Sequence, residues 1–137
     1  MPGKRYQRGL AMLHQMVGYE QGELVRRTWE SLAPDFAKYV LEFLAGEIWK
    51  RPHLDLRTRS LVTVAALTAL GRSRGLELNI RMAVNNGATK EEVIETLLQM
   101  APYAGFPACW EGIVIADQVF KSMDDPRVKP KGIRKRR

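Results

Sequence analysis

Cysteine is almost absent from this chain of 137 residues, which contains only Cys109. A single cysteine excludes an internal disulfide and a Cys-x-x-Cys redox pair, and we expect a buried small apolar side chain rather than a nucleophile. The two histidines, His14 and His53, lie far apart, and neither has a metal-ligand partner at helical spacing. No nucleotide-binding glycine pattern, zinc-ligand spacing or catalytic triad occurs. The common short catalytic motifs are therefore missing.

Long apolar runs and strand patterns are missing as well. No run of about 18 apolar residues occurs, so we expect no membrane span. With a single cysteine, the cytoplasm is the default compartment. Residues 1–23 combine basic residues with a short apolar run, but polar residues recur and no small-residue cleavage site follows, so we predict a first helix and not a signal peptide. No segment alternates with strand period. We therefore predict an all-α fold of six to seven helices. Because 45% of the residues are hydrophobic, the chain can bury a sizeable core.

Acidic residues are absent from residues 127–137, which carry seven of the 22 basic residues. Residues 1–126 then hold 15 basic and 15 acidic residues, so the net charge of +7 belongs to the C-terminal segment. We predict one domain over 1–126 and a basic tail over 127–137. A solvated tail is favoured over a nucleic-acid-binding one, because no basic face or aromatic–basic interleaving supports nucleic-acid binding elsewhere.

Residues 56–70 have the clearest helix boundaries in the chain. Asp55 can cap the first turn and Gly71 can end the last one. A second clear helix start lies at Thr89, because Glu92 follows three residues later with the spacing of a capping box. Further helices are predicted over 6–17, 23–32, 36–49, 76–84 and 107–123. The helices over 56–70 and 107–123 carry apolar residues on most faces, and a small domain can bury these faces by sharing them between subunits, so we predict a homo-oligomer.

Polar residues gather at helix ends beside these apolar helices. Six of them fall within 13 residues: Glu47, Trp49, Arg51, His53, Arg57 and Arg59. A second group is Arg81, Asn85 and Asn86. Arginine forks match carboxylates, so a pocket for an anionic small molecule is one interpretation. The other is that the arginines pair with acidic residues to tie helices together: Glu42, Glu47, Asp55 and Glu77.

Residues 46–107 contain an ordered set of short motifs: Gly46, Ile48-Trp49, Arg51-Pro52, Arg59-Ser60-Leu61, Leu78, Arg81, Asn85-Asn86-Gly87, Thr89, Glu92, Gln99, Tyr103, Gly105 and Pro107-Ala108. Their order resembles the carboxymuconolactone decarboxylase family, and the resemblance extends over residues 6–121. It implies the all-helical fold shared with alkylhydroperoxidase D and a homo-oligomer, a hexamer or a trimer. It also implies cofactor-free decarboxylation of an unsaturated lactone acid in aromatic catabolism, with no metal.

The sequence departs from the family at informative positions. The peroxidase branch has two cysteines near Arg72 and Gly75 and a glutamate near Ser60, so its redox chemistry is excluded here. The decarboxylase branch has a histidine where this chain has Asn79, which can donate a hydrogen bond but cannot titrate. His53 stands where the family usually has glycine. It either replaces the family histidine that is missing at position 79 or is a histidine of a surface loop.

The resemblance and the residue types together give a candidate site. We expect Glu47 and His53 to act as acid or base, and Asn79 to stabilise an enolate. The predicted substrate-binding residues are the carboxylate ligands Arg51, Arg59 and Arg81, and the pocket walls Trp49 and Tyr103. Because of Asn79, two alternatives stay open. One is a different proton-transfer reaction, such as isomerisation, cyclisation or lactone or ester chemistry, and the other is a non-catalytic scaffold with a basic tail.

Overall fold

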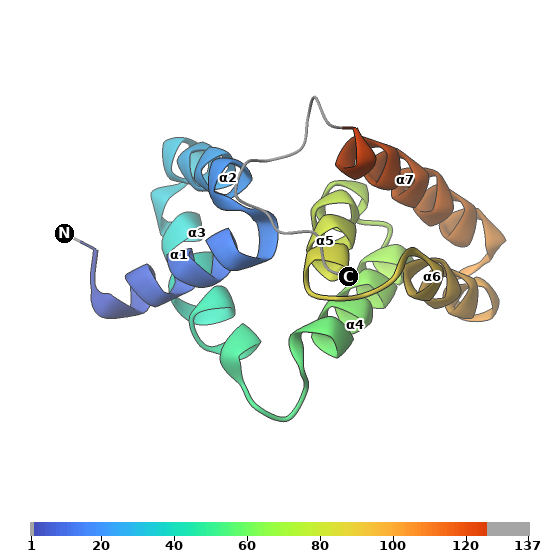
Figure 1. Ribbon diagram of the computed structural model, residues 1–137, viewed down its shortest axis with the longest axis horizontal. Helices are drawn as coiled ribbons and strands as arrows, with labels where there is room; N and C mark the ends of the chain where they lie inside the picture. The colour runs from blue at the N-terminus through green and yellow to red at the C-terminus, as the bar shows by residue number, and fades with distance from the viewer. Residues whose placement is uncertain (1, 126–137) are drawn as a thin grey trace. The chain divides into compact units, whose positions relative to one another are not determined.

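The computed structural model describes residues 2–125, so the predicted basic tail over 127–137 lies outside the described residues. Within 2–125 the chain forms helices and no strand, which confirms the all-α class (Figure 1). The α-helices are α1 (Lys4–Val17), α2 (Tyr19–Leu32), α3 (Pro34–Tyr39), α4 (Leu56–Leu70), α5 (Ser73–Asn85), α6 (Lys90–Ala104) and α7 (Phe106–Asp124). None of these described helices is both long and apolar enough to cross a membrane.

The described residues fall into two compact units, 2–53 and 54–125. The first holds α1 to α3, a π-helical segment η1 (Val40–Ala45) and a short 3-10 turn η2 (Ile48–Lys50). The second holds α4 to α7. One domain over 1–126 stays a prediction.

In the unit 2–53, α1 packs directly on η1 at a glycine. A Cβ atom at Gly9 would lie 1.6 Å from the carbonyl oxygen of Leu41, so only glycine allows the two backbones to come this close. Leu13, Met16 and Val17 of α1 are buried, as is Leu41. Close backbone contact and apolar burial therefore hold α1 against the middle of the segment predicted as one helix.

That segment, 36–49, differs from its prediction. The structure divides it into α3, η1 and η2, and Gly46 donates to the Leu41 carbonyl across the wider π-type turn at 3.0 Å. The backbone leaves helical geometry at Glu47, where φ is −122° and ψ is −56°. The wider turn coincides with the place where α1 approaches, so tertiary packing and not local propensity accounts for the break.

In the unit 54–125, α4 to α7 surround one apolar core. Its buried members include Val64, Leu76, Ile80, Val93, Leu97, Cys109, Ala116 and Val119. A Cβ at Gly112 of α7 would lie 2.8 Å from a methyl group of Leu97, which shows how closely α6 and α7 pack. Cys109 is buried and has a free thiol, as its sequence position predicted.

Capping fixes the helix ends in this unit. The Asp55 carboxylate accepts from the Thr58 backbone N–H at 2.7 Å, and Gly71 adopts a left-handed conformation with φ of 72°. Both ends of the helix predicted over 56–70 are therefore confirmed. Thr89 and Glu92 form the predicted capping box at the start of α6. By contrast, α5 and α2 begin at Ser73 and Tyr19, earlier than predicted.

Candidate functional site

The eight predicted site residues divide evenly between the two units. Residues 2–53 contain Glu47, Trp49, Arg51 and His53, and residues 54–125 contain Arg59, Asn79, Arg81 and Tyr103.

The first group lies around η2 and the turn that follows it. The Glu47 carboxylate accepts a hydrogen bond from the Arg5 guanidinium of α1, and both side chains are about half exposed. Trp49 is buried, at 6% exposure. Arg51 and His53 are exposed on the turn between Lys50 and Leu56. Glu47 is thus held by a cation, whereas His53 has the position of a surface loop residue.

Two arginines at the start of α4 have structural contacts. Arg59 donates through Nη2 to the Leu54 carbonyl at 3.2 Å. Arg57 forms an ion pair with Glu92 of α6, and its Nε lies 3.2 Å from the same carboxylate. The interpretation that arginines tie helices together therefore holds for Arg57, although its acid is Glu92 and not one of the four expected.

On α5, Asn79 and Arg81 make different contacts. The Asn79 side-chain nitrogen donates to the Gly75 carbonyl one turn earlier, at 2.8 Å. The Arg81 guanidinium lies 3.5 Å from the Ser122 hydroxyl of α7. Residues two apart on a helix do not face each other, so these two side chains leave α5 in different directions.

Tyr103, the predicted wall residue, is 77% exposed near the end of α6. Neighbouring large apolar side chains on α6 and α7 are exposed too. They are Leu98, Phe106, Trp110 and Val114. In this unit Tyr103 therefore belongs to an exposed apolar surface.

A buried polar pair connects α4 to the end of α5. Asn86 donates through Nδ2 to the Ser60 hydroxyl at 2.9 Å, and the residues are 6% and 0% exposed. Sequence reasoning treated each residue separately and did not predict that they meet. The available signal was their presence in two of the family motifs, Arg59-Ser60-Leu61 and Asn85-Asn86-Gly87.

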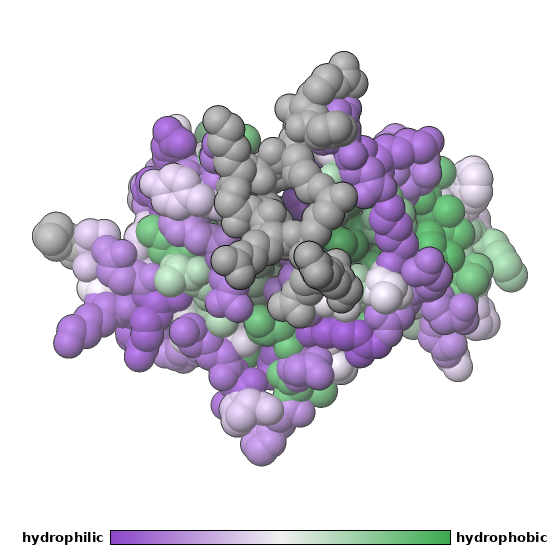
Figure 2. Space-filling view, in the orientation of Figure 1, coloured by the Kyte–Doolittle hydropathy of each residue, from purple (hydrophilic) through white to green (hydrophobic). Residues whose placement is uncertain are grey.

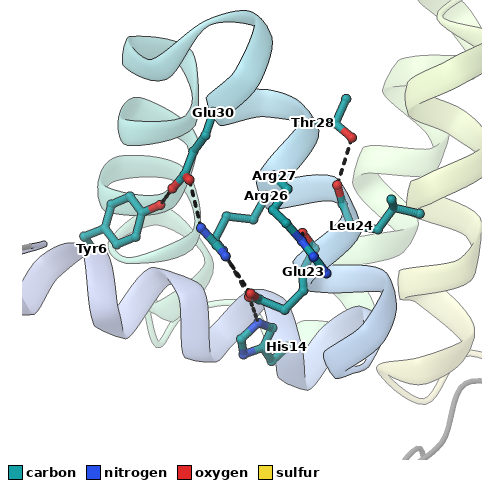
Figure 3. Close-up of polar contacts among 8 residues, drawn as sticks. All are labelled: Tyr6, His14, Glu23, Leu24, Arg26, Arg27, Thr28 and Glu30. Carbon is teal, nitrogen blue, oxygen red and sulfur yellow. Dashed lines mark hydrogen bonds and ion pairs between the residues drawn. The ribbon is translucent and has the colours of Figure 1, made fainter.

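A chain of polar side chains joins α1 to α2 (Figure 3). Arg26 donates to both oxygens of Glu23, at 2.6 and 3.0 Å, and to Glu30 at 2.8 Å. His14 Nε2 lies 2.7 Å from Glu23, and the Tyr6 hydroxyl donates to Glu30. Sequence reasoning missed this cluster, although Glu23, Arg26 and Glu30 follow helical spacing.

These contacts shift the titration of the cluster. The hydrogen bonds from Arg26, and then from His14, lower the pKa of Glu23 to about 2. The Tyr6 hydroxyl and Arg26 lower the pKa of Glu30. Burial and then the bond to Glu30 raise the pKa of Tyr6. Glu23 and Glu30 are therefore ionised at neutral pH and face the Arg26 guanidinium within α2. The hydrogen bond from Tyr6 to Glu30 and the contact of His14 with Glu23 join this charged group to α1.

Two open grooves lie within the unit 54–125. One, of about 460 Å³, runs between α4 and α6 and includes Leu61, Val62 and Met100. The other, of about 470 Å³, runs between α6 and α7. None of the eight predicted site residues lines either groove. Among residues 2–125, no group of three or more His, Cys, Asp or Glu side chains is placed to hold a metal ion.

Comparison with known proteins identifies the family. Residues 34–118 match the carboxymuconolactone decarboxylase family. The chain is 40% identical to 4-carboxymuconolactone decarboxylase of Acinetobacter baylyi over 123 residues, which cover 88% of this chain and 90% of the relative. It is 30% identical to nitrosuccinic acid decarboxylase of Metarhizium robertsii over 122 residues, which cover 88% and 84%.

A third relative, an uncharacterised 15.0 kDa protein of Paracoccus denitrificans, is 36% identical over 101 residues, or 72% of this chain and 75% of the relative. The matches to the two decarboxylases extend over nearly the whole of the described chain and agree with its all-helical fold. The chain therefore belongs to the carboxymuconolactone decarboxylase family.

Proposed function

We propose that this chain is a decarboxylase that acts, without a cofactor, on a small dicarboxylic acid carrying an electron-withdrawing group. The observation that carries this proposal is the 40% identity to 4-carboxymuconolactone decarboxylase over 90% of that enzyme. 4-Carboxymuconolactone is the first substrate to test, which would place the enzyme in aromatic catabolism. The fungal relative supports the reaction class through a different acid.

The names of the two relatives describe acids with shared chemistry. Carboxymuconolactone and nitrosuccinic acid each carry two carboxylates and an acceptor, a conjugated lactone carbonyl or a nitro group. When the bond to one carboxylate breaks, carbon dioxide leaves, the electron pair moves into the acceptor, and a proton is then added to carbon. The protein must bind the remaining carboxylate, stabilise the negative oxygen and supply that proton.

The candidate residues supply groups of the required types. Arg51, Arg59 and Arg81 are proposed to hold carboxylates, because a guanidinium donates a planar fork that fits them. Asn79 uses its side-chain nitrogen toward Gly75, but that nitrogen carries a second hydrogen that can donate to an oxyanion. Its amide cannot deliver a proton, so this step is assigned to two other candidates, Glu47 and His53. Trp49 and Tyr103 are proposed as walls.

The direct test is carbon dioxide release by the purified chain from 4-carboxymuconolactone and, separately, from nitrosuccinic acid. An Asn79→His variant is measured beside the natural chain, with Glu77→Gln, an exposed change on the same helix, as the control. Release by the natural chain supports the proposal and leaves Glu47 and His53 as the proton donors to separate. Release by neither protein from either acid refutes this substrate class.

A second candidate function rests on Asn79 itself. With a residue that does not titrate in place of the family histidine, the proposed site residues would catalyse proton transfer without loss of carbon dioxide, as in isomerisation, cyclisation or lactone or ester chemistry. Product formation without carbon dioxide, detected by chromatography and mass spectrometry, would favour this function. Activity that appears only in Asn79→His would favour it too, because the substrate would then fit a site that lacks the donor.

Exposed apolar side chains in the unit 54–125 support self-association. Val62 and Leu70 on α4 are 54% and 66% exposed, and Trp110 on α7 is 65% exposed. Exposed apolar surface on this scale commonly marks an interface, so we propose a homo-oligomer, a trimer or a hexamer. Sedimentation at micromolar concentration tests it: a mass that stays at 15.6 kDa would contradict it. Trp110→Ser should lower the mass, whereas Glu111→Gln should not.

A further inference from the structure

The groove between α6 and α7 has an apolar floor and an acidic border. Its floor is formed by Ile94 of α6 and by Ile113 and Phe120 of α7. Its border carries Glu91, Glu95, Asp117 and Lys90. Figure 2 shows hydrophobic surface over α6 and α7 next to hydrophilic residues. Such a groove fits a basic segment that also carries apolar side chains.

Two of the four charges at the border are already neutralised. Lys90 pairs with Asp124 and lies 5.6 Å from the centre of the Phe120 ring. Asp117 pairs with Lys121 at 2.9 Å. Lys90 and Lys121 are each already paired with another carboxylate, Asp124 and Asp117.

Glu91 and Glu95 are the other two border charges. They lie four residues apart on α6, so their carboxylates face the same side of the helix. No ion pair or hydrogen bond is made by either side chain within the described residues. Like charges at this spacing destabilise a helix slightly, and a cation bound between them would remove that repulsion.

The chain itself carries a segment of matching chemistry directly after α7 in the sequence. The helix α7 ends at Asp124, and residues 127–137 carry seven basic residues and no acidic one. Val128 and Ile133 are apolar side chains among these charges. Twelve residues from 126 onward can span up to about 40 Å, whereas Ile113 and Phe120 are separated by about 10 Å along their helix. The tail is therefore long enough to turn back and cover the groove.

We propose that the basic tail, residues 127–137, docks in the α6–α7 groove of its own chain. Its lysines and arginines would contact Glu91 and Glu95, and Val128 or Ile133 would cover the apolar floor. This interaction is independent of the proposed decarboxylase activity, because the groove contains none of the proposed site residues. The contact depends on attraction between seven basic side chains and two carboxylates, so it should weaken as salt is added. The Debye screening length falls from about 10 Å at 0.1 M salt to about 3 Å at 1 M.

Zero-length cross-linking of the full chain tests the proposal. A carbodiimide joins a carboxylate to a lysine in contact with it, and mass spectrometry then identifies the pair. We expect links from Lys129, Lys131 or Lys135 to Glu91 or Glu95, at least fivefold more abundant than links to Glu77 and Glu111, the exposed control acids of the same unit. Raising the salt to 1 M before the reagent is added should reduce them several-fold.

Isotope labelling distinguishes a tail that docks on its own chain from a tail that docks on another copy. Unlabelled and ¹⁵N-labelled chains are unfolded together, refolded and cross-linked, so that a link between two copies joins a light peptide to a heavy one. Links within light or within heavy chains support the proposal. Mixed links amounting to half of the total would show that another copy's tail occupies the groove, and would overturn it.

A matched pair of variants completes the test. In Glu91→Gln/Glu95→Gln the tail lysines should no longer be protected from acetylation by a water-soluble reagent, whereas in Glu77→Gln/Glu111→Gln their protection should match that of the natural chain. All four glutamates are exposed, so neither pair should prevent folding, which circular dichroism checks. Equal acetylation in all three proteins, or links to Glu91 and Glu95 no stronger than to the control acids, would refute docking.

Discussion

Asn86 at the end of α5 donates a hydrogen bond of 2.9 Å to the hydroxyl of Ser60 on α4, and both side chains are buried. The bond joins positions 26 residues apart in sequence. A buried amide that loses its acceptor bears the full cost of having left water, so this pair makes the packing of α4 and α5 specific as well as stable.

Ser60→Ala should therefore lower the free energy of unfolding by about 1–3 kcal/mol. The control is Thr63→Ala, because the Thr63 hydroxyl bonds only to the Arg59 carbonyl of its own helix. Urea denaturation followed by circular dichroism gives both values. Equal losses in the two variants would show that the Asn86 contact contributes no special stability.

Gly9→Ala should destabilise the unit 2–53 severely. Helix propensity alone would favour alanine by about 1 kcal/mol, but its Cβ would lie 1.6 Å from the Leu41 carbonyl oxygen. The backbone would have to move, at a cost of about 3 kcal/mol or more. At Gly3 no atom lies within 4 Å of the added Cβ, so Gly3→Ala should cost less than about 1 kcal/mol. A thermal melt of each variant checks the order, and a Gly9→Ala protein as stable as Gly3→Ala would contradict the close approach.

Glu23 should make the free energy of unfolding depend on pH in the acid range. Arg26, then His14, lowers the pKa of Glu23 from its ordinary 4.5 to about 2. Its contribution is therefore complete above pH 4.5 and is lost as the pH falls from there toward 2. Its size at neutral pH is at most about 3 kcal/mol.

The measurement is the stability of the natural chain and of Glu23→Gln between pH 7 and pH 2. The difference between them should be constant down to about pH 5 and then shrink as the natural carboxylate is protonated. Glu20→Gln, an exposed change on the same helix, should remain close to the natural chain throughout. A difference that persists undiminished at pH 2 would rule out the charged contact as its cause.

The capping box and the ion pair at Glu92 should differ in strength. Thr89→Ala removes the cap on α6 and should cost about 1 kcal/mol. Glu92→Gln keeps an oxygen that can accept from the Thr89 N–H but loses the charge facing Arg57. Because those side chains are 42% and 31% exposed, that loss should stay below about 1 kcal/mol. Chemical denaturation of the single variants ranks them, and a larger cost for Glu92→Gln would reverse the assignment.

Asn79→Ala should lower kcat on the accepted substrate more than it raises KM. A donor to the developing oxyanion acts mainly on the transition state, so its loss should reduce kcat about 10- to 100-fold with KM nearly unchanged. Steady-state kinetics beside the Glu77→Gln control separates the two parameters. A change confined to KM would assign Asn79 to ordinary substrate binding.

Much of the fold could be predicted because residues at or next to each helix end determine the helix boundaries. Asp55 and Gly71 set the ends of α4, and Thr89 with Glu92 sets the start of α6. The break within 36–49 could not be predicted, because it lies where α1 packs on η1 through Gly9. That contact depends on residues more than 30 positions away in sequence.

The candidate site was less predictable than the fold. The sequence alone indicates suitable residue types, but only the folded structure shows that Arg5 donates to Glu47 and that Arg59 donates to the Leu54 carbonyl. The Ser60–Asn86 pair escaped prediction for a similar reason, since a serine and an asparagine have many possible partners until the helices are packed. The residue types in a site are local information, and their contacts are not.

The two contacts of Glu92 also affect which of two residues, Arg57 or Glu92, is substituted more easily during evolution. Its carboxylate accepts from the Thr89 N–H and pairs with Arg57. A lineage can exchange Arg57 at little cost, because the helix cap survives. Exchange of Glu92 for a residue other than glutamine weakens the cap and also removes the acid that faces Arg57. Among descendants of this chain, Arg57 should therefore change more often than Glu92.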